Sequence, residues 1–107
     1  MSRNKLQTLT EQMFYTLLCL KTECYGLDIL ERIPAMTENR VNIGSGTLYT
    51  LLEQFAEAGL IRETKVEGRR RSYILTKSGF EVLQNEVKRI EAQLADYRTV
   101  FEKDGRN

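Results

Sequence analysis

Histidine is absent from the 107-residue sequence. Histidine is the commonest general base and the commonest metal ligand in proteins, so its absence removes every Ser-His and Cys-His arrangement. Paired carboxylates offer no substitute, because Glu53 and Glu57 on one helix face, like Glu63 and Glu67, are expected to be solvated surface charges. We therefore expect no enzyme, no metal site and no cofactor.

Cysteine is nearly absent too, with only Cys19 and Cys24, five positions apart. No third or fourth cysteine or histidine accompanies them, so the spacing matches no zinc site. In a cytoplasmic protein we expect reduced thiols, with Cys19 filling core space. Redox sensing is the alternative.

Long apolar runs are also missing. None approaches the roughly 18 to 20 residues that a membrane-spanning helix needs. The N-terminal stretch "MSRNKLQTLTEQ" is too polar for the apolar region of a signal peptide. With 41% apolar and 29% charged residues, the chain has the length and composition of one folded domain. We expect a cytoplasmic protein with no membrane association.

The net charge is only +1, but basic residues are concentrated locally. Between positions 62 and 71 lie five of them: Arg62, Lys65, Arg69, Arg70 and Arg71. The N-terminal tail adds Arg3 and Lys5. Local basic patches favour binding to a polyanion even when the net charge is near zero.

The pattern of the first half predicts three helices. Thr10 is expected to cap a first helix, in which "MFYTLLCL" (13–20) is apolar on nearly every face and needs covering on more than one side. A second helix is predicted over 27–33, ended by Pro34, with Leu27, Leu30 and Ile33 inward. A third is predicted over 47–58, capped by Ser45 or Thr47 after a turn at Gly44–Gly46. Its inward residues are Leu48, Leu51, Leu52 and Phe55, and Gly59 is its left-handed C-terminal residue.

The second half predicts a β-hairpin followed by one long helix. The strands are expected at 60–66 and 72–76, with "EGRRR" as the turn, and Thr76 is expected to cap the helix. This helix carries apolar residues spaced alternately by three and four: Phe80, Leu83, Val87, Ile90, Leu94, Tyr97 and Phe101. Such a heptad seam either packs on its own domain or, as we favour, pairs its distal half with another subunit. The expected dimer contacts are Phe14, Leu17, Leu18, Val87, Ile90, Leu94, Tyr97 and Phe101.

The stretch "IGSGTLYTLL" (43–52) resembles a phosphate-binding loop at first sight. A dinucleotide fingerprint needs a third glycine where Tyr49 stands, and a P-loop needs a Gly-Lys-Ser/Thr ending that is absent. A helix-turn-helix explains the stretch better, since its second helix presents uncharged hydrogen-bonding groups and a basic hairpin follows. We expect base contacts from Ser45, Thr47, Tyr49 and Thr50, and phosphate contacts from Lys65, Arg69, Arg70 and Arg71.

Two stretches, "GSGTLYTLLEQFAEAGLI" and "EGRRRSYILTKSG", resemble the PadR family of winged-helix transcriptional regulators. The resemblance extends over about residues 9–101. It implies that Thr47 and Tyr49 contact DNA, that the basic residues after Gly68 form the wing, and that Tyr73, Thr76 and Gly79 belong to the wing-to-helix signature. It also implies a homodimer formed by the first and last helices.

The chain departs from the family pattern at three points. Thr50 replaces the usual proline after the recognition tyrosine, and Leu27 replaces a tyrosine in the second helix. The chain has no tryptophan, whereas the multidrug-binding members of the family use a tryptophan of the C-terminal helix to stack flat aromatic ligands. A smaller aromatic effector would have to use Phe14, Tyr15, Tyr97 and Phe101 between subunits.

The sequence therefore predicts a mainly α fold with a small β-hairpin wing. Residues 1–76 are expected to form a winged helix-turn-helix DNA-binding domain and residues 77–107 a dimerisation helix. The predicted function is a homodimeric transcriptional regulator, a repressor on a palindromic operator in double-stranded DNA. The alternatives are a winged-helix protein-interaction module and a sensor of a small aromatic ligand.

Overall fold

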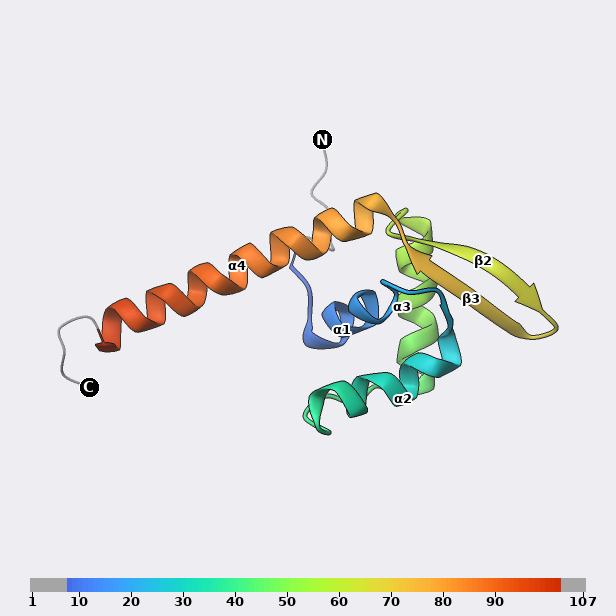
Figure 1. The fold of residues 1–107 in the computed structure, drawn as a ribbon, viewed down its shortest axis with the longest axis horizontal. Helices are drawn as coiled ribbons and strands as arrows, with labels where there is room; N and C mark the ends of the chain where they lie inside the picture. The colour runs from blue at the N-terminus through green and yellow to red at the C-terminus, as the bar shows by residue number, and fades with distance from the viewer. Residues whose placement is uncertain (1–7, 103–107) are drawn as a thin grey trace.

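Residues 8–102 form four helices and a three-stranded antiparallel sheet in the computed structural model of the chain, and the structure describes these residues alone. The elements are α1 (Glu11–Cys19), β1 (Cys24–Tyr25), α2 (Gly26–Thr37), α3 (Ser45–Glu57), β2 (Ile61–Glu67), β3 (Arg70–Leu75) and α4 (Lys77–Glu102) (Figure 1). This confirms the mainly helical fold with a small wing. The basic residues Arg3 and Lys5 and the predicted continuation of the last helix past Glu102 lie outside the described residues.

Helix α1 begins where the sequence predicts. The Thr10 hydroxyl accepts a hydrogen bond from the amide of Met13 at 3.1 Å, which satisfies one of the free N–H groups of the first turn. Thr16, Leu17 and Leu20 are fully buried beneath the helix, whereas Leu18 is exposed on its other side. One face of α1 is thus used by its own domain, and the other is not.

Helix α2 is longer than predicted. Pro34 lies inside it and does not end it, because a proline removes a single helical hydrogen bond and the helix has only one turn left to run. The end comes at Glu38 and Asn39, both with positive φ, and the amide of Asn39 donates to the carbonyl of Pro34 at 2.8 Å. The buried stripe is also different: Ile29 and Ile33 are fully buried, Leu30 is partly buried, and Leu27 is 57% exposed.

Helix α3 begins two residues earlier than predicted. Its N-cap is Gly44, and no side chain among the described residues caps it, so neither Ser45 nor Thr47 has that role. The predicted inward stripe of Leu48, Leu51, Leu52 and Phe55 is confirmed. At the other end Gly59 adopts a φ of 78°, and the amides of Gly59 and Leu60 donate to the carbonyls of Ala56 and Phe55. This pair of bonds is a Schellman motif, as the glycine predicted.

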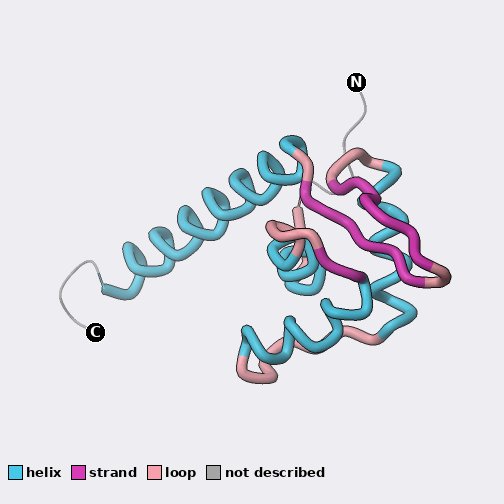
Figure 2. The backbone as a smooth tube through the Cα atoms, turned by 45° about the vertical axis from the view of Figure 1, so that its right-hand side comes forward, coloured by secondary structure: helices cyan, strands magenta, loops and turns pink. Residues whose placement is uncertain are grey.

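The sheet has the strand order β1-β3-β2, and β1 was not predicted (Figure 2). β2 and β3 pair from Ile61↔Leu75 to Glu67↔Arg70, which leaves a two-residue loop of Gly68 and Arg69. Gly68 has a φ of 62°, and a positive φ at the first loop position is what a type II′ hairpin turn requires. β1 is only two residues long and pairs with Tyr73 and Ser72 of β3. Its brevity explains why no alternating pattern revealed it.

Helix α4 starts at the predicted cap and then leaves the domain. The Thr76 hydroxyl accepts from the amide of Gly79 at 3.1 Å, which confirms Thr76 as the cap. Gly79, Leu83 and Glu86 are buried against the domain, whereas every residue from Val87 to Glu102 is exposed. Figure 1 shows this distal half extending beyond the other elements. The predicted division at residues 76 and 77 stays a prediction.

Glu86 ties the start of the described chain to α4. Its carboxylate is 2% exposed, pairs with Arg89 and accepts a hydrogen bond from the amide of Leu9 at 3.4 Å. The hydrogen bond from Arg89 and the amide of Leu9 lower the pKa of Glu86 although burial opposes them, so the carboxylate stays ionised. The segment before α1 and the third turn of α4 are therefore held together.

Replacing Gly79 by alanine should destabilise the protein. A Cβ atom there would lie 2.1 Å from the carbonyl oxygen of Leu60 and 2.7 Å from Cδ1 of Leu75, so the backbone itself would have to move. We expect a loss of about 1–3 kcal/mol in the free energy of unfolding. The measurement is urea denaturation at a fixed protein concentration.

Gly46→Ala is the matched control, since Gly46 also lies in the first turn of a helix. No heavy atom among the described residues lies within 4 Å of a Cβ at that position. This variant should be neutral or more stable by up to about 1 kcal/mol, because alanine costs less conformational entropy in a helix. Equal denaturation midpoints for the two variants would contradict the close contact at Gly79.

Candidate nucleic-acid interface

Helices α2 and α3 pack against each other and form a helix-turn-helix. The turn between them contains the two residues with positive φ, Glu38 and Asn39. It is fastened to α1 by Gln12, whose Nε2 donates to the carbonyl of Asn42 at 2.8 Å. Because the inward stripe of α3 is fully covered, the rest of its surface is left for a partner.

All four predicted base-reading residues lie on the exposed surface of α3, but they do not share one face. Tyr49 is 46% exposed, and Ser45 precedes it by four positions and so lies on the same side. Thr47 and Thr50 are three positions apart and lie further round the helix. Tyr49 lines a cavity together with the wing arginines. Thr50 and Thr47 lie about 100° and about 160° round the helix from it, both in the same direction.

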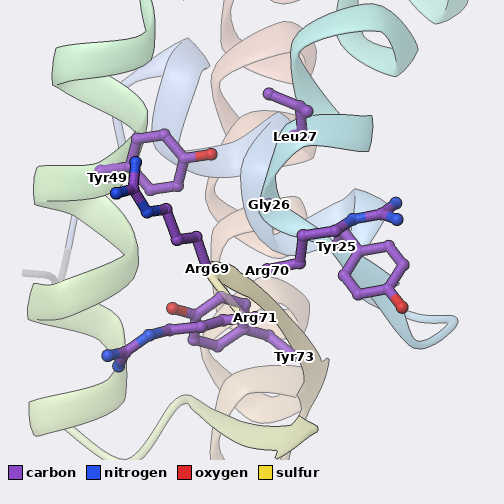
Figure 3. A pocket seen from close by; sticks show the side chains of 8 residues that line it. All are labelled: Tyr25, Gly26, Leu27, Tyr49, Arg69, Arg70, Arg71 and Tyr73. Atoms are coloured by element: carbon purple, nitrogen blue, oxygen red, sulfur yellow. The ribbon is translucent and has the colours of Figure 1, made fainter. Parts of the chain in front are cut away.

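A cavity of about 350 Å³ lies among α3, the wing and the start of α2. It is lined by Tyr25, Gly26, Leu27, Tyr49, Arg69, Arg70, Arg71 and Tyr73 (Figure 3). Residues that lie far apart in the sequence thus converge on one cleft, which is lined by both tyrosine and arginine side chains. The sequence predicted Tyr49 and the three arginines, but not that they share a cavity.

The three arginines of the wing have different surroundings. Arg71 pairs with Glu63 at 3.3 Å, and the guanidinium of Arg70 lies 4.0 Å from the centroid of the Tyr25 ring. Arg69 occupies the hairpin loop and makes no ion pair with any residue in 8–102. In Figure 3 its side chain reaches toward Tyr49. Arg69 is the arginine best placed for a new anionic partner, whereas Arg71 already has one.

Acidic residues lie on the opposite side of Tyr49. A second cavity of about 350 Å³, between α3 and the base of the wing, is lined by Tyr49, Leu52, Glu53, Ala56, Glu57, Glu63, Arg71 and Tyr73. Burial raises the pKa of Tyr73 first of all, and the charge of Glu63 adds to that effect. The carboxylates that the sequence indicated only as surface charge thus lie in a second cavity beside Tyr49, whereas Arg69 and Arg70 line only the first and Arg71 lines both.

Lys65, predicted to contact DNA, is not grouped with the arginines. It lines a separate cavity of about 230 Å³ with Glu23, Cys24, Tyr25, Asp28, Arg32 and Ser72. Two carboxylates share that cavity with it, so its charge is partly balanced locally. The arginines around Tyr49, without Lys65, make up the basic part of the cleft.

Tyr25 and Gly26 are residues of the cleft that the sequence did not mark as functional. The hydroxyl of Tyr25 donates to Oε1 of Glu67, and this hydrogen bond raises the pKa of Tyr25. At Gly26 a Cβ atom would lie 3.2 Å from Cε1 of Tyr49, so the tyrosine ring rests directly on this glycine. No spacing rule reveals either contact, because both join segments more than twenty residues apart.

The predicted dimer contacts divide into two groups. Leu17 is 0% exposed within its own subunit, so it has no surface to offer a partner and its prediction as an interface residue is corrected. Phe14 is partly buried and packs on the core, while Leu18 is exposed. The α4 residues of the seam are between 39% and 60% exposed: Val87, Ile90, Leu94, Tyr97 and Phe101.

The four aromatic residues predicted to line an effector site form two pairs, each within one helix. Phe14 and Tyr15 of α1 meet edge to face with ring centroids 5.3 Å apart. Tyr97 and Phe101 of α4 lie 5.1 Å apart. A site that used both pairs would have to be assembled from α1 and the distal part of α4.

The cysteines and carboxylates show no sign of metal binding. Among the described residues no group of three or more histidines, cysteines, aspartates or glutamates could hold a metal ion. Both cysteines are buried and unpaired, and burial raises the pKa of Cys19 to about 11. Its thiol is therefore protonated at neutral pH, which favours the structural role predicted for it.

No helix in residues 8–102 combines the length and the apolar character of a membrane span.

Comparison with known proteins agrees with this arrangement. The model of the transcriptional regulator PadR-like family matches residues 16–85. A PadR family transcriptional regulator from Eggerthella lenta is 20% identical with a TM-score of 0.71, covering 85% of this chain and 81% of that one. A PadR-like transcription factor from Bacteroides fragilis is 27% identical with a TM-score of 0.63, covering 80% and 84%. A transcriptional regulator from Clostridium thermocellum is 21% identical with a TM-score of 0.69, covering 90% and 93%. No curated protein sequence matches significantly.

The family match extends over more than half of the chain, from α1 through the helix-turn-helix and the wing into α4. The solved structures share the fold over most of their length. Members of this family are DNA-binding transcription regulators and not enzymes. The chain belongs to the PadR-like family of transcriptional regulators.

Proposed function

We propose that the protein is a repressor that binds a palindromic operator as a homodimer, with α3 in the major groove and the wing on the flanking backbone. The observation that carries this proposal is the convergence of Tyr49 and the wing arginines on one cleft. A helix in the major groove and a basic wing beside it must face the DNA together. Transcription control of this kind would take place in the cytoplasm.

Base reading is assigned to uncharged groups and phosphate binding to the arginines. Ser45, Thr47, Tyr49 and Thr50 all have hydroxyl groups and lie on the exposed surface of α3. Hydroxyl and apolar groups read base edges, whereas Arg69 and Arg70 supply charge for phosphates that carry no sequence information. The carboxylates on the far side of Tyr49 would repel a phosphate strand, so the duplex backbone should follow the arginine side of the cleft.

The dimer is assigned to the distal half of α4. Apolar residues at heptad spacing are left exposed there, from Val87 to Phe101, and a contiguous apolar face of this kind is typical of an interaction site. A second copy of the same helix offers the complementary surface in a two-fold dimer. Two-fold symmetry in the protein implies two-fold symmetry in the operator, with half-sites about one helical turn apart.

A small aromatic effector is a second candidate feature of this regulator. The two aromatic pairs, Phe14 with Tyr15 and Tyr97 with Phe101, support it, because flat apolar ligands stack on such rings. A ligand held between α1 and α4 of different subunits would change the separation of the two recognition helices. Fluorescence titration of the tyrosines with aromatic compounds, with and without operator DNA, tests this idea.

Selection of bound sequences from random duplex DNA tests the main proposal. The protein should enrich a palindromic motif. Tyr49→Ala should weaken binding to that motif about tenfold or more, since one good base contact contributes ~1–3 kcal/mol of discrimination. Binding to random DNA should change little. An equal loss of affinity for the motif and for random DNA would mean that Tyr49 does not read bases. A stable complex with a protein, together with no binding to DNA, would favour a protein-interaction module.

Arg69→Ala should lower the salt dependence of DNA binding. Removing one contact to a phosphate reduces the slope of log K against log salt by about 0.9. Arg71→Ala is the matched control, because Arg71 is already paired with Glu63 and its removal should change the slope less. Fluorescence anisotropy, measured at salt concentrations from about 50 to about 300 mM, gives the affinity for DNA and hence the slope for each variant. Identical slopes for Arg69→Ala and the unaltered protein would mean that this guanidinium does not touch DNA.

Ile90→Asp should break the dimer. It inserts a charge into the centre of the α4 seam, and two-fold symmetry places that charge in the interface twice. We expect a cost of about 2 kcal/mol or more in dimer stability, visible by analytical ultracentrifugation. Ala92→Asp is the control, since Ala92 is exposed on the opposite side of α4 and its variant should remain dimeric. An intact Ile90→Asp dimer would exclude the seam as the interface.

A further inference from the structure

Tyr25 is the residue at which β1 passes into α2, and it holds the tip of the wing. Its ring lies under the guanidinium of Arg70 at 4.0 Å, and its hydroxyl donates to the carboxylate of Glu67. Its backbone pairs with Ser72 of β3. Glu67 and Arg70 are opposite each other in the hairpin and flank the loop that contains Arg69. One side chain thus contacts both residues that fix the loop.

We propose that Tyr25 is a positioning residue for DNA binding: it holds the wing arginines in place relative to the recognition helix. The proposal rests on the function proposed above, because it is the DNA contact that gives this position a use. Tyr25 itself need not touch DNA. Its effect acts through Arg70 and through the loop that carries Arg69.

The first argument is the weakness of an isolated hairpin tip. Beyond β1, the outer part of the wing consists of β2 and β3 alone, and a two-stranded hairpin is marginally stable at best. Arginine also has a large rotamer entropy, which is reduced when it binds a phosphate. Because the Tyr25 ring already orders Arg70 in the free protein, less of this rotamer entropy is lost when Arg70 binds a phosphate.

The second argument concerns charge. Glu67 is directly opposite Arg70, the arrangement in which cross-strand ion pairs form. Within the described chain these two residues make no ion pair, and Glu67 instead accepts a hydrogen bond from the Tyr25 hydroxyl. The Tyr25 hydroxyl thus binds one oxygen of the carboxylate that would otherwise be free to pair with Arg70. By contrast, Arg71 lacks such protection and is paired with Glu63.

The third argument is that Gly26, the residue next to Tyr25, fixes the position of the Tyr49 side chain, to which base reading is assigned above. The ring of Tyr49 rests on Gly26, where a Cβ atom would lie 3.2 Å from Cε1 of Tyr49 and 3.0 Å from Cδ1 of Leu52. Figure 3 shows Arg70 beside Tyr25 and Arg69 beside Tyr49 at the two sides of the cavity. The start of α2 is thus the common reference for the recognition helix and for the wing.

Trypsin digestion of the free protein tests the positioning without DNA. Trypsin cleaves after arginine, so the cleavage rate after Arg69, Arg70 and Arg71 reports how firmly the wing is held. Tyr25→Leu should raise that rate about fivefold to tenfold, because it removes the cation–π interaction and the hydrogen bond. Tyr25→Phe keeps the ring and should raise it about twofold. Cleavage after Arg98, on α4, serves as the internal control and should not change.

Binding to the selected operator tests the consequence for DNA. Tyr25→Leu should weaken binding about fivefold, on operator and random DNA alike, because the effect acts through a phosphate-binding residue. In the Arg70→Ala background the same substitution should weaken binding less than it does alone, since only its effect through the loop that carries Arg69 is left. If Tyr25→Leu folds poorly, Tyr25→Phe, alone and in the Arg70→Ala background, keeps the test decisive.

The failures of the two proposals can be told apart. A protein that binds no DNA overturns the proposed function, while the trypsin rates of the free protein still decide whether Tyr25 holds the wing. Specific DNA binding by the unaltered protein, together with unchanged wing cleavage in Tyr25→Leu and additive effects with Arg70→Ala, would overturn the positioning role and leave the regulator intact. Faster wing cleavage together with non-additive effects supports the role.

Discussion

The contact between Gly79 and the backbone of Leu60 joins the end of α3 and the wing to the start of α4. Leu60 follows the Schellman turn of α3 and opens β2, while Gly79 lies in the first turn of α4. The amide of Thr76 donates to the carbonyl of Leu60 at 3.0 Å, and the Thr76 hydroxyl donates to the carbonyl of Gly59 at 2.6 Å. The end of α3, both strands of the wing and the start of α4 therefore meet at one point where only glycine fits.

The rigidity of this junction matters for the proposed function. In the proposed dimer, the separation of the two α3 helices depends on how rigidly each is joined to α4. The joint is short, hydrogen-bonded and closely packed, so in that dimer a change in the angle between the two α4 helices would be passed to α3 with little attenuation. The buried Glu86, which binds both Arg89 and the amide of Leu9, adds a second attachment one helical turn beyond Leu83.

Periodic features could be predicted from the sequence, and contacts between distant segments could not. The inward stripe of α3, the cap at Thr76 and the left-handed Gly59 follow local rules, because each depends on residues within one or two turns. Pro34 misled the prediction of α2, since one missing hydrogen bond does not end a helix that is packed on a core. β1 has two residues and no periodicity. Spacing rules could not predict the partners of Arg70 and Arg71 or the contact of Tyr49 with Gly26, because these contacts depend on the fold.

The near-neutral charge of the chain makes the placement of each arginine matter more. Proteins with a large positive field bind DNA of any sequence through many loose contacts. This chain has a net charge of +1, and in the described wing one arginine is paired with Glu63 while another is stacked on Tyr25. In the proposed complex Arg69 and the ordered Arg70 supply the phosphate contacts of the wing, while Arg71 is held by Glu63. Under the proposed function, discrimination between sequences depends on ordered contacts around Tyr49, and Tyr25 and Gly26 contribute by positioning the residues that make them.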